Sequence, residues 1–427
     1  MSAALPDGDP VPRDGSLPET ATRQLGVHPL GIYVHIPFCR TRCGYCDFNT
    51  YTHAELGGGA SQQAYPGTVG QEVALARRAL SEGGPDNSKK RPEGAGGRED
   101  GGKNRVPPAS TVFFGGGTPT LLPPREIGAI MRAIGDAFGL LPGAEVTIEA
   151  NPETVDQRSL SQLREQGVTR VSFGMQSDVE HVLAVLDRQH APGRPQQCAR
   201  WAREAGFEHV SLDLIYGTPG ESDDDWRRSL DAALSAGPDH VSAYALIVEE
   251  GTRLAAKVRR GEIPAPDDDV LADRYLIADD MLSAAGLHWY EISNWAASAA
   301  ARCQHNMLYW TGGDWWGLGP GAHSHVGGTR WWNVRHPSGY AARLADGRSP
   351  AAAREILSAG EQAMENIMLR LRLREGLPLA ELSPTARGTA EGYLKTGHLA
   401  RDAWHAGRLV LTRDGRLLAD ALIRDLT

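Results

Sequence analysis

The chain has 427 residues, 41% hydrophobic and 23% charged, which is the composition of an ordinary globular protein and excludes collagen-like, coiled-coil and wholly disordered chains. Its 53 acidic residues outnumber its 44 lysines and arginines and give a formal net charge of -9, so we expect no general nucleic-acid binding. No apolar run reaches the roughly 20 residues that cross a bilayer, and the N-terminus has no signal-peptide pattern. We therefore expect a cytoplasmic protein without an integral membrane segment.

The first two thirds of the chain alternate short apolar runs with helical patterns. Residues 1–28, rich in Pro, Asp, Ser and Thr, are expected to form a disordered leader, and residues 84–108 a flexible insertion. Strands are predicted at 31–37, 111–114, 145–149, 170–173, 209–215 and 240–246, with helices at 63–81, 124–138, 159–166, 196–205 and 225–236. This alternation predicts a parallel sheet with right-handed crossovers, and six units favour an α/β fold with a partial (βα)6 barrel.

The last third of the chain has a different pattern. A helix is predicted at 271–285, a strand at 288–292, and a Gly- and Trp-rich region follows at 310–332. A helix at 355–371, two short helices and a hairpin with strands at 409–411 and 416–418 resemble a small winged-helix module. We therefore expect a leader at 1–28, a barrel core at 29–265, an extension at 266–350 and a C-terminal winged-helix-like domain at 351–427.

Three of the five cysteines, Cys39, Cys43 and Cys46, lie on one loop directly after the first predicted strand. Zinc would usually need a fourth ligand at a paired spacing, and Asp47 after Cys46 excludes the C-x-x-C-H motif for haem attachment. A four-iron cluster held by only three cysteines leaves one iron open to a small chelating ligand. A zinc knuckle or simply buried thiols remain the alternative. The isolated Cys198 and Cys303 are interpreted as bystanders.

Glycine-rich and polar segments follow the next predicted strands. In the run 114–120, Phe-Gly-Gly-Gly-Thr-Pro-Thr, the glycines would let backbone groups approach a ligand closely. Glu149 ends the third predicted strand, Gln176 follows the fourth, and Asp213 lies within the fifth. Each alone is most simply a polar cap at a strand end, but their recurrence on consecutive strands favours a shared ligand site.

The C-x3-C-x2-C loop followed by the glycine-rich turn resembles the radical S-adenosylmethionine (SAM) superfamily. This resemblance implies a partial (βα)6 barrel in which Cys39, Cys43 and Cys46 hold a [4Fe-4S] cluster and SAM binds its open iron. It also implies that electron transfer from the cluster cleaves SAM to methionine and a 5'-deoxyadenosyl radical. The positions that match SAM-contacting residues are Tyr33, Tyr45, Gly116, Gly117, Thr118, Glu149, Gln176, Arg188, Asp213 and Ala245.

A series of stretches between residues 31 and 324 resembles one branch of that superfamily, the coproporphyrinogen III oxidase-like proteins. In this branch the oxygen-independent coproporphyrinogen III dehydrogenase normally continues its motif as C-x3-C-x2-C-x-C, whereas the HemW haem chaperones read C-x2-C-D-F. Here Phe48 stands where the fourth cysteine would be, and residues 305–310 match the H-N-x-x-Y-W element of the chaperones. A leader of disordered composition, in place of an ordered lid, favours the same subgroup.

The resemblance therefore implies a haem chaperone that keeps the cluster and SAM, binds haem and passes it to an unidentified acceptor protein, with an electron donor for the cluster. His305 is the candidate haem ligand, and its alternative is a histidine hydrogen-bonded at the sheet edge. His323 and His325 are further candidate ligands that are not selected. Two enzymatic alternatives stay open: the dehydrogenase, which converts coproporphyrinogen III to protoporphyrinogen IX by oxidative decarboxylation, and a radical SAM enzyme acting on another tetrapyrrole.

Overall fold

The structure, a computed structural model, describes residues 7–56, 60–82 and 106–427. Its framework is a twelve-stranded sheet in which the first six strands lie side by side in chain order and run parallel. These strands are β1 (Leu30–Ile36), β2 (Ala109–Gly116), β3 (Leu140–Ala150), β4 (Arg170–Gln176), β5 (His209–Tyr216) and β6 (His240–Ala245). The six predicted strands and the α/β fold class are confirmed. Residues 1–6 of the expected leader and 84–105 of the expected insertion lie outside the described residues.

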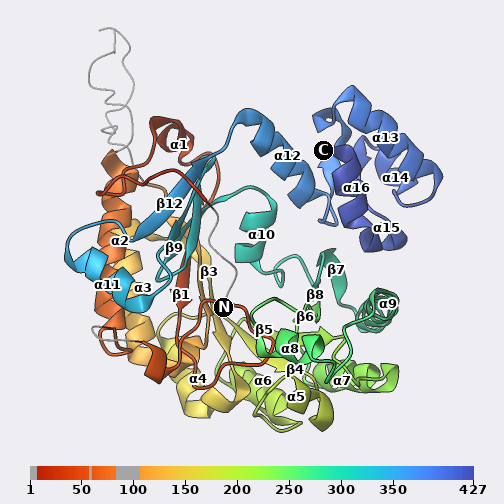
Figure 1. Cartoon of the computed structure of the whole chain (residues 1–427), viewed down its shortest axis with the longest axis horizontal. Helices are drawn as coiled ribbons and strands as arrows, with labels where there is room; N and C mark the ends of the chain where they lie inside the picture. Colours follow the sequence, from red (N-terminus) through yellow and green to blue (C-terminus); the bar gives the residue numbers. More distant parts are fainter. Residues whose placement is uncertain (1–6, 57–59, 83–105) are drawn as a thin grey trace.

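Helices between the strands cover the outside of the sheet, as Figure 1 shows. They are α2 (Tyr65–Glu82), α3 (Pro124–Phe138), α4 (Gln157–Glu165), α5 (Glu180–Val185), α6 (Arg194–Glu204) and α7 (Asp223–Ser235), with α8 (Arg253–Arg259) and α9 (Asp268–Ala284) after β6. Within this layer α2 packs against α3, α3 against α4, and α6 against α7. Strands covered on both faces read as nearly continuous apolar runs, and β1 is buried at every position except Tyr33.

The sheet continues beyond the parallel strands at both ends. Next to β1 lies β9 (Asp314–Leu318), again parallel, followed by the antiparallel strands β10 (His323–Val326), β11 (Thr329–Asn333) and β12 (Ala351–Ile356). Next to β6 lie β8 (Asn294–Ala296) and β7 (His288–Glu291). The Gly- and Trp-rich region is therefore mostly sheet. Within the described residues β12 and β7 are the two ends of the strand order, so the barrel is partial.

The expectation of a disordered leader is wrong for residues 7–28. The backbone N–H of Asp9 donates to the Arg354 carbonyl at 2.8 Å and the carbonyl of Asp9 accepts from Arg354 at 3.0 Å, so this segment pairs with the edge strand β12. Residues Glu19–Gln24 then form helix α1, in which Ala21 is fully buried. An edge strand offers unpaired backbone groups to any neighbouring segment. The order of this segment thus comes from a strand more than 300 residues away, which its own composition does not reveal.

The C-terminal part is mainly helical and lies beside the sheet at the upper right of Figure 1. It contains α12 (Ala359–Arg370), α13 (Pro384–Lys395), α14 (Arg401–His405), α15 (Arg413–Leu417) and α16 (Ala419–Leu426), and the short strands β13 (Leu377–Pro378) and β14 (Arg408–Leu409) pair with each other. Its buried leucines form a cluster separate from that of the barrel. Helix α10 (Gln304–Trp310) and helix α11 (Pro337–Ala345) precede this part in the chain.

One element prediction in this region is wrong in where the helix starts, and another is wrong in the type of element. The predicted helix at 355–371 begins only at Ala359, because residues 351–356 pair with β11 and Ser358 caps the helix by accepting from the backbone N–H of Glu361. The predicted hairpin around Thr412 is helix α15 instead, since the Thr412 side chain accepts from the backbone N–H of Gly415 and caps a helical turn. Within α12, Met364 is half exposed.

Helix α15 attaches the C-terminal part to the barrel side of the molecule. The Arg416 guanidinium pairs with the Asp279 carboxylate at 2.7 Å, and Arg413 pairs with Asp280 at 2.8 Å. Both acidic residues belong to α9. Arg416 also lies over the Trp289 ring, 4.4 Å from its centroid. Across the residues that the structure describes, no helix is both long enough and apolar enough to span a membrane.

Candidate functional site

The cysteine loop is closed at its base against the end of β1. Phe38 and Tyr51 form a parallel bridge, in which the Cys39 N–H donates to the Tyr51 carbonyl at 3.0 Å and the Tyr51 N–H donates to the Pro37 carbonyl at 2.7 Å. On the far side, the Leu254 N–H donates to the Gly44 carbonyl at 2.9 Å. The loop therefore lies over the carboxyl ends of the parallel strands, where barrel proteins place their chemistry.

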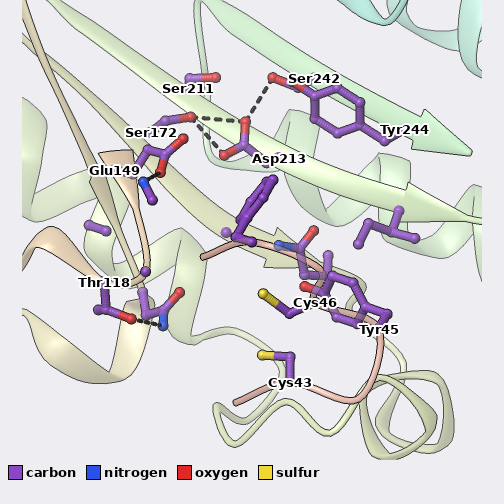
Figure 2. Close-up of a pocket in the computed structure, with 18 of the residues that line it drawn as sticks. Cys43, Tyr45, Cys46, Thr118, Glu149, Ser172, Ser211, Asp213, Ser242 and Tyr244 are labelled. Carbon is purple, nitrogen blue, oxygen red and sulfur yellow. Dashed lines mark hydrogen bonds between the residues drawn. The ribbon is translucent and has the colours of Figure 1, made fainter. Parts of the chain in front are cut away.

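A cavity of about 500 Å³, here called the barrel cavity, opens beneath this loop (Figure 2). Cys39, Cys43 and Cys46 line it together with residues from the ends of β2 to β6. The predicted SAM contacts that line it are Tyr45, Gly116, Gly117, Thr118, Glu149, Gln176, Arg188, Asp213 and Ala245. The structure thus brings together every predicted site position except Tyr33 and His305.

The three thiols are partly buried and lie among polar groups. The Thr118 hydroxyl is 4.0 Å from the Cys39 Sγ, and Arg188 Nη1 is 3.7 Å from the Cys43 Sγ. Burial raises the pKa of Cys39, and burial together with the neighbouring thiols raises the pKa of Cys46 to about 11. Both are therefore neutral thiols here and would release protons to bind a metal. Among the described residues no three Cys, His, Asp or Glu side chains converge closely enough to hold a metal ion.

The glycine-rich turn after β2 packs directly against the cysteine loop. Gly116 has a φ of 110°, which side chains rarely allow, and its N–H donates to Glu149 Oε2 at 3.1 Å. A Cβ atom at Gly117 would lie 2.5 Å from the Phe38 carbonyl oxygen and 3.1 Å from the Cys39 Sγ. Only glycine fits at this place, so the backbone of the turn can border the space next to the thiols.

Two carboxyl groups, Glu149 and Asp213, lie deep in the barrel cavity (Figure 2). Asp213 accepts hydrogen bonds from the Ser172 hydroxyl at 2.9 Å and from the Ser242 hydroxyl at 2.7 Å. Burial raises the pKa of both carboxyls, and burial followed by the charge of Asp213 raises the pKa of Glu149 to about 8. The cavity floor is thus built to receive a cationic or hydrogen-bond-donating ligand.

Arg188 and Gln176 leave polar atoms without partners at the same site. Gln176 has a φ of 63°, unusual for a residue other than glycine, and its Oε1 has no hydrogen-bond partner within the described chain. Arg188 Nη2 donates to the Gly174 carbonyl at 2.8 Å and to Asn151 Oδ1 at 3.0 Å, while its Nε is unpaired in the same part of the chain. Buried polar atoms of this kind point to a polar ligand.

Asn151 is a cavity residue that the sequence reasoning missed. Its side chain joins Arg188 to Thr118, because Asn151 Nδ2 donates to the Thr118 hydroxyl at 3.1 Å. The sequence feature that could have indicated it is its position directly after β3, two residues beyond Glu149, which was predicted to contact SAM. It therefore belongs with the strand-end positions rather than with the following turn.

His305 and Tyr33 lie outside the barrel cavity. His305 is only 1% exposed; its Nδ1 is 2.7 Å from the Thr111 hydroxyl and its Nε2 is 2.8 Å from the Tyr309 hydroxyl. Both ring nitrogens of His305 are therefore hydrogen-bonded. This matches the alternative interpretation, in which His305 is a hydrogen-bonded histidine at the sheet edge and not a haem ligand. Tyr33 does not line the barrel cavity, and its hydroxyl lies 3.0 Å from His35 Nδ1.

Tyr33 instead faces a second cavity of about 670 Å³, here called the lateral cavity. Its walls come from β1, α10, β9, β10 and α12, and they include Tyr33, Phe48, Tyr309, Trp310, Trp315, His323 and His325. Phe48, which stands where the dehydrogenase motif has a cysteine, is 60% exposed and borders both cavities. The lateral cavity was not predicted from the sequence.

We expect the stability of the cofactor-free protein to fall as the pH rises from about 5 to about 8, in part because of Glu149. Its pKa is raised from 4.5 to about 8 by burial, so over this range the unfolded chain loses a proton that the folded chain keeps. Glu149→Gln should remove this contribution and flatten the profile. Urea midpoints of both proteins across this pH range test the expectation, and parallel profiles would contradict it.

The thiol loop, glycine turn and strand-end carboxyls over a partial barrel define a radical SAM protein. Residues 33–233 match the family model of the radical SAM superfamily. The chain is 51% identical to the Heme chaperone HemW of Mycobacterium tuberculosis, over 93% of this chain and 95% of that protein. It is 30% identical to the Heme chaperone HemW of Escherichia coli, over 92% of this chain and 97% of that protein. The chain therefore belongs to the HemW family, in the coproporphyrinogen III oxidase-like group of the radical SAM superfamily.

A solved structure shares this fold. It is the Escherichia coli coproporphyrinogen III oxidase HemN, described as a radical SAM enzyme, which superposes on this structure with a TM-score of 0.76. The superposition covers 96% of this chain and 92% of the HemN chain. Sequence identity to it is 20%, so the likeness concerns the fold alone. The predicted family and fold are confirmed.

Proposed function

We propose that this protein is a haem chaperone that carries a [4Fe-4S] cluster and an exchangeable SAM, binds haem and transfers it to an acceptor protein. The observation that carries the proposal is Phe48. It forms an open part of the cavity wall where the dehydrogenase motif has its fourth cysteine, as in the C-D-F reading of the HemW sequences. The relatives named heme chaperones, which match over nearly the whole chain, support it. The expectation of a disordered leader does not support the proposal, because residues 7–28 are ordered.

The barrel cavity fits the two cofactors that the family implies. Three soft thiol ligands on one loop suit an iron–sulfur cluster, and no fourth cysteine lines the same loop. Gly116 and Gly117 leave backbone groups accessible beside the thiols, and the unpaired Gln176 Oε1 and Arg188 Nε can bind the polar ends of SAM. A reduced cluster supplies an electron to SAM when both are bound. Asp213 and Glu149 would orient the ligand through its hydroxyl or ammonium groups.

Two partners complete the proposal. An electron donor must reduce the cluster, and an acceptor protein must take up the haem. Both partners are proposed from the family resemblance. The protein is proposed to bind SAM without converting coproporphyrinogen III.

The experiment compares chaperone and dehydrogenase directly. Anaerobically reconstituted protein is titrated with haemin and, separately, given SAM, reductant and coproporphyrinogen III. We expect saturable haemin binding with a shifted Soret band and no protoporphyrinogen, because the dehydrogenase motif is incomplete at Phe48. Escherichia coli HemN serves as the positive control for decarboxylation. Stoichiometric decarboxylation without tight haemin binding would reject the chaperone in favour of the dehydrogenase.

A further inference from the structure

The lateral cavity offers a site for haem separate from the barrel cavity, which is lined by every matched SAM position except Tyr33. On the basis of the proposed haem-chaperone function, we propose that haem binds in the lateral cavity and that Nε2 of His325 is its axial iron ligand. The cavity of about 670 Å³ lies within the range of about 300–1,000 Å³ typical of small-molecule sites. Its aromatic walls suit a flat, apolar ring system with polar groups at one edge.

The hydrogen bonding of His325 fixes which nitrogen is available to a metal. His325 Nδ1 lies 3.1 Å from the carbonyl oxygen of Gly313. A carbonyl can only accept, so Nδ1 must carry the proton and Nε2 must carry the lone pair of the neutral ring. A backbone carbonyl on Nδ1 is the usual way in which proteins orient a metal-binding imidazole. Nε2 has no hydrogen-bond partner within the described part of the chain.

Packing around His325 holds the ring in place and keeps it neutral. The Trp315 ring lies 5.0 Å from the imidazole at an interplanar angle of 32°, and Trp315 in turn packs edge-on against Tyr309 at 4.6 Å. Burial lowers the pKa of His325, and this effect exceeds that of the nearby Asp314 carboxyl, so the ring stays unprotonated at neutral pH. Only the unprotonated ring can bind iron.

Neighbouring histidines lack this arrangement. His323 lies two residues earlier on the same face of β10 and lines the same cavity, and its ring stacks on Trp332 at 5.9 Å. Among the described residues no hydrogen bond fixes the tautomer of its ring. His305 has both nitrogens engaged and borders neither cavity. The geometry therefore selects His325 among the three histidines that the sequence offered.

Two arginine side chains of the lateral cavity carry the charge that haem propionates require. Arg330 and Arg335 line the lateral cavity, and Arg330 stands opposite His325 in the β10–β11 register. Arg330 is paired with Glu355 at 2.7 Å and with Glu365, so a propionate would compete with these carboxylates for it. A porphyrin with carboxylate groups at one edge matches this distribution.

The test uses the full-length protein with its cluster reconstituted, titrated with haemin under argon. We expect His325→Ala to weaken haemin binding about tenfold or more and to lose the imidazole-type Soret band, because the iron loses its ligand. Added imidazole should restore that band in the variant. The matched control is His323→Ala, which removes an imidazole from the same wall and should retain the band. Iron content and SAM binding should match the parent chain in both variants, since neither residue borders the barrel cavity.

The outcomes separate this inference from the proposed function. Absence of haemin binding by the parent protein would reject the chaperone function itself. Binding by the parent that His325→Ala leaves unchanged, or that only His305→Gln or His323→Ala abolishes, would overturn the assignment of His325 while the chaperone function stands. A band lost in His325→Ala and regained with imidazole confirms the ligand.

Discussion

Cys43→Ser is expected to abolish the visible absorption of the reconstituted protein almost completely and to leave its secondary structure unchanged. A serine hydroxyl is a poor ligand for iron in a cluster, and with only three cysteines on the loop none can be spared. The fold should survive because Cys43 is only partly buried and lies outside the apolar core, and Arg188 is its hydrogen-bonding neighbour, 3.7 Å away. Iron analysis and circular dichroism of both proteins measure the two effects.

Cys198→Ala is the control for this prediction. Cys198 is fully buried within the barrel core, and its thiol donates to the Pro152 carbonyl at 3.5 Å. Its replacement should reduce stability slightly and leave the iron content unchanged, the reverse of the Cys43 result. Undiminished iron in Cys43→Ser, or equal loss in both variants, would refute the assignment of the cluster ligands.

Arg170→Met is expected to reduce the free energy of unfolding by about 3–5 kcal/mol, the usual cost of breaking a buried ion pair. Arg170 is 1% exposed and pairs with Glu145 at 2.8 Å. Arg170 uses Nε in this pair, and its Nη2 donates to the carbonyls of Ala301 and Arg302 at 2.8 and 3.0 Å. Glu145 in turn accepts from the His305 N–H at 3.1 Å. The pair thereby ties the start of α10 to the barrel, and its loss leaves a buried carboxylate unpaired.

Urea denaturation of the cofactor-free variants measures this cost. Adding Glu145→Gln to Arg170→Met should recover part of the loss, because the uncompensated charge disappears while an acceptor for the His305 N–H remains. The surface control is Arg23→Met, which breaks an ion pair whose side chains are 62% and 61% exposed and should cost less than about 1 kcal/mol. Similar losses for Arg170→Met and Arg23→Met would show that the buried pair has no special role.

The barrel cavity could be predicted because its signals are local and repeat along the chain. Each parallel strand places its carboxyl end at the same edge of the sheet, so a thiol loop after β1 and polar residues after β2 to β5 must meet. The positions of Glu149 and Asp213 follow from strand order alone. Their raised pKa values depend on burial, which no local pattern reports.

The lateral cavity could not be predicted because it combines segments far apart in the chain. Tyr33, His325 and Met368 lie on β1, β10 and α12, and only the long-range pairing of β9 with β1 brings them to one space. The wrong hairpin has a different cause: Thr-Arg-Asp-Gly contains residues that favour both a turn and a helix cap, and tertiary contacts decide between them. One such contact is at Gly415, where a Cβ atom would lie 2.0 Å from the His398 carbonyl oxygen, so only glycine allows α15 to pack this closely against His398.

Phe48 has a thermodynamic consequence because its ring borders both cavities. If a ligand in one cavity moves this ring and changes affinity for a ligand in the other, linkage requires the second ligand to change affinity for the first by the same factor. The effect of the first ligand on binding of the second and the effect of the second on binding of the first would then report the same coupling free energy. The residue at the position of the fourth cysteine is thus also a side chain that the two cavities share.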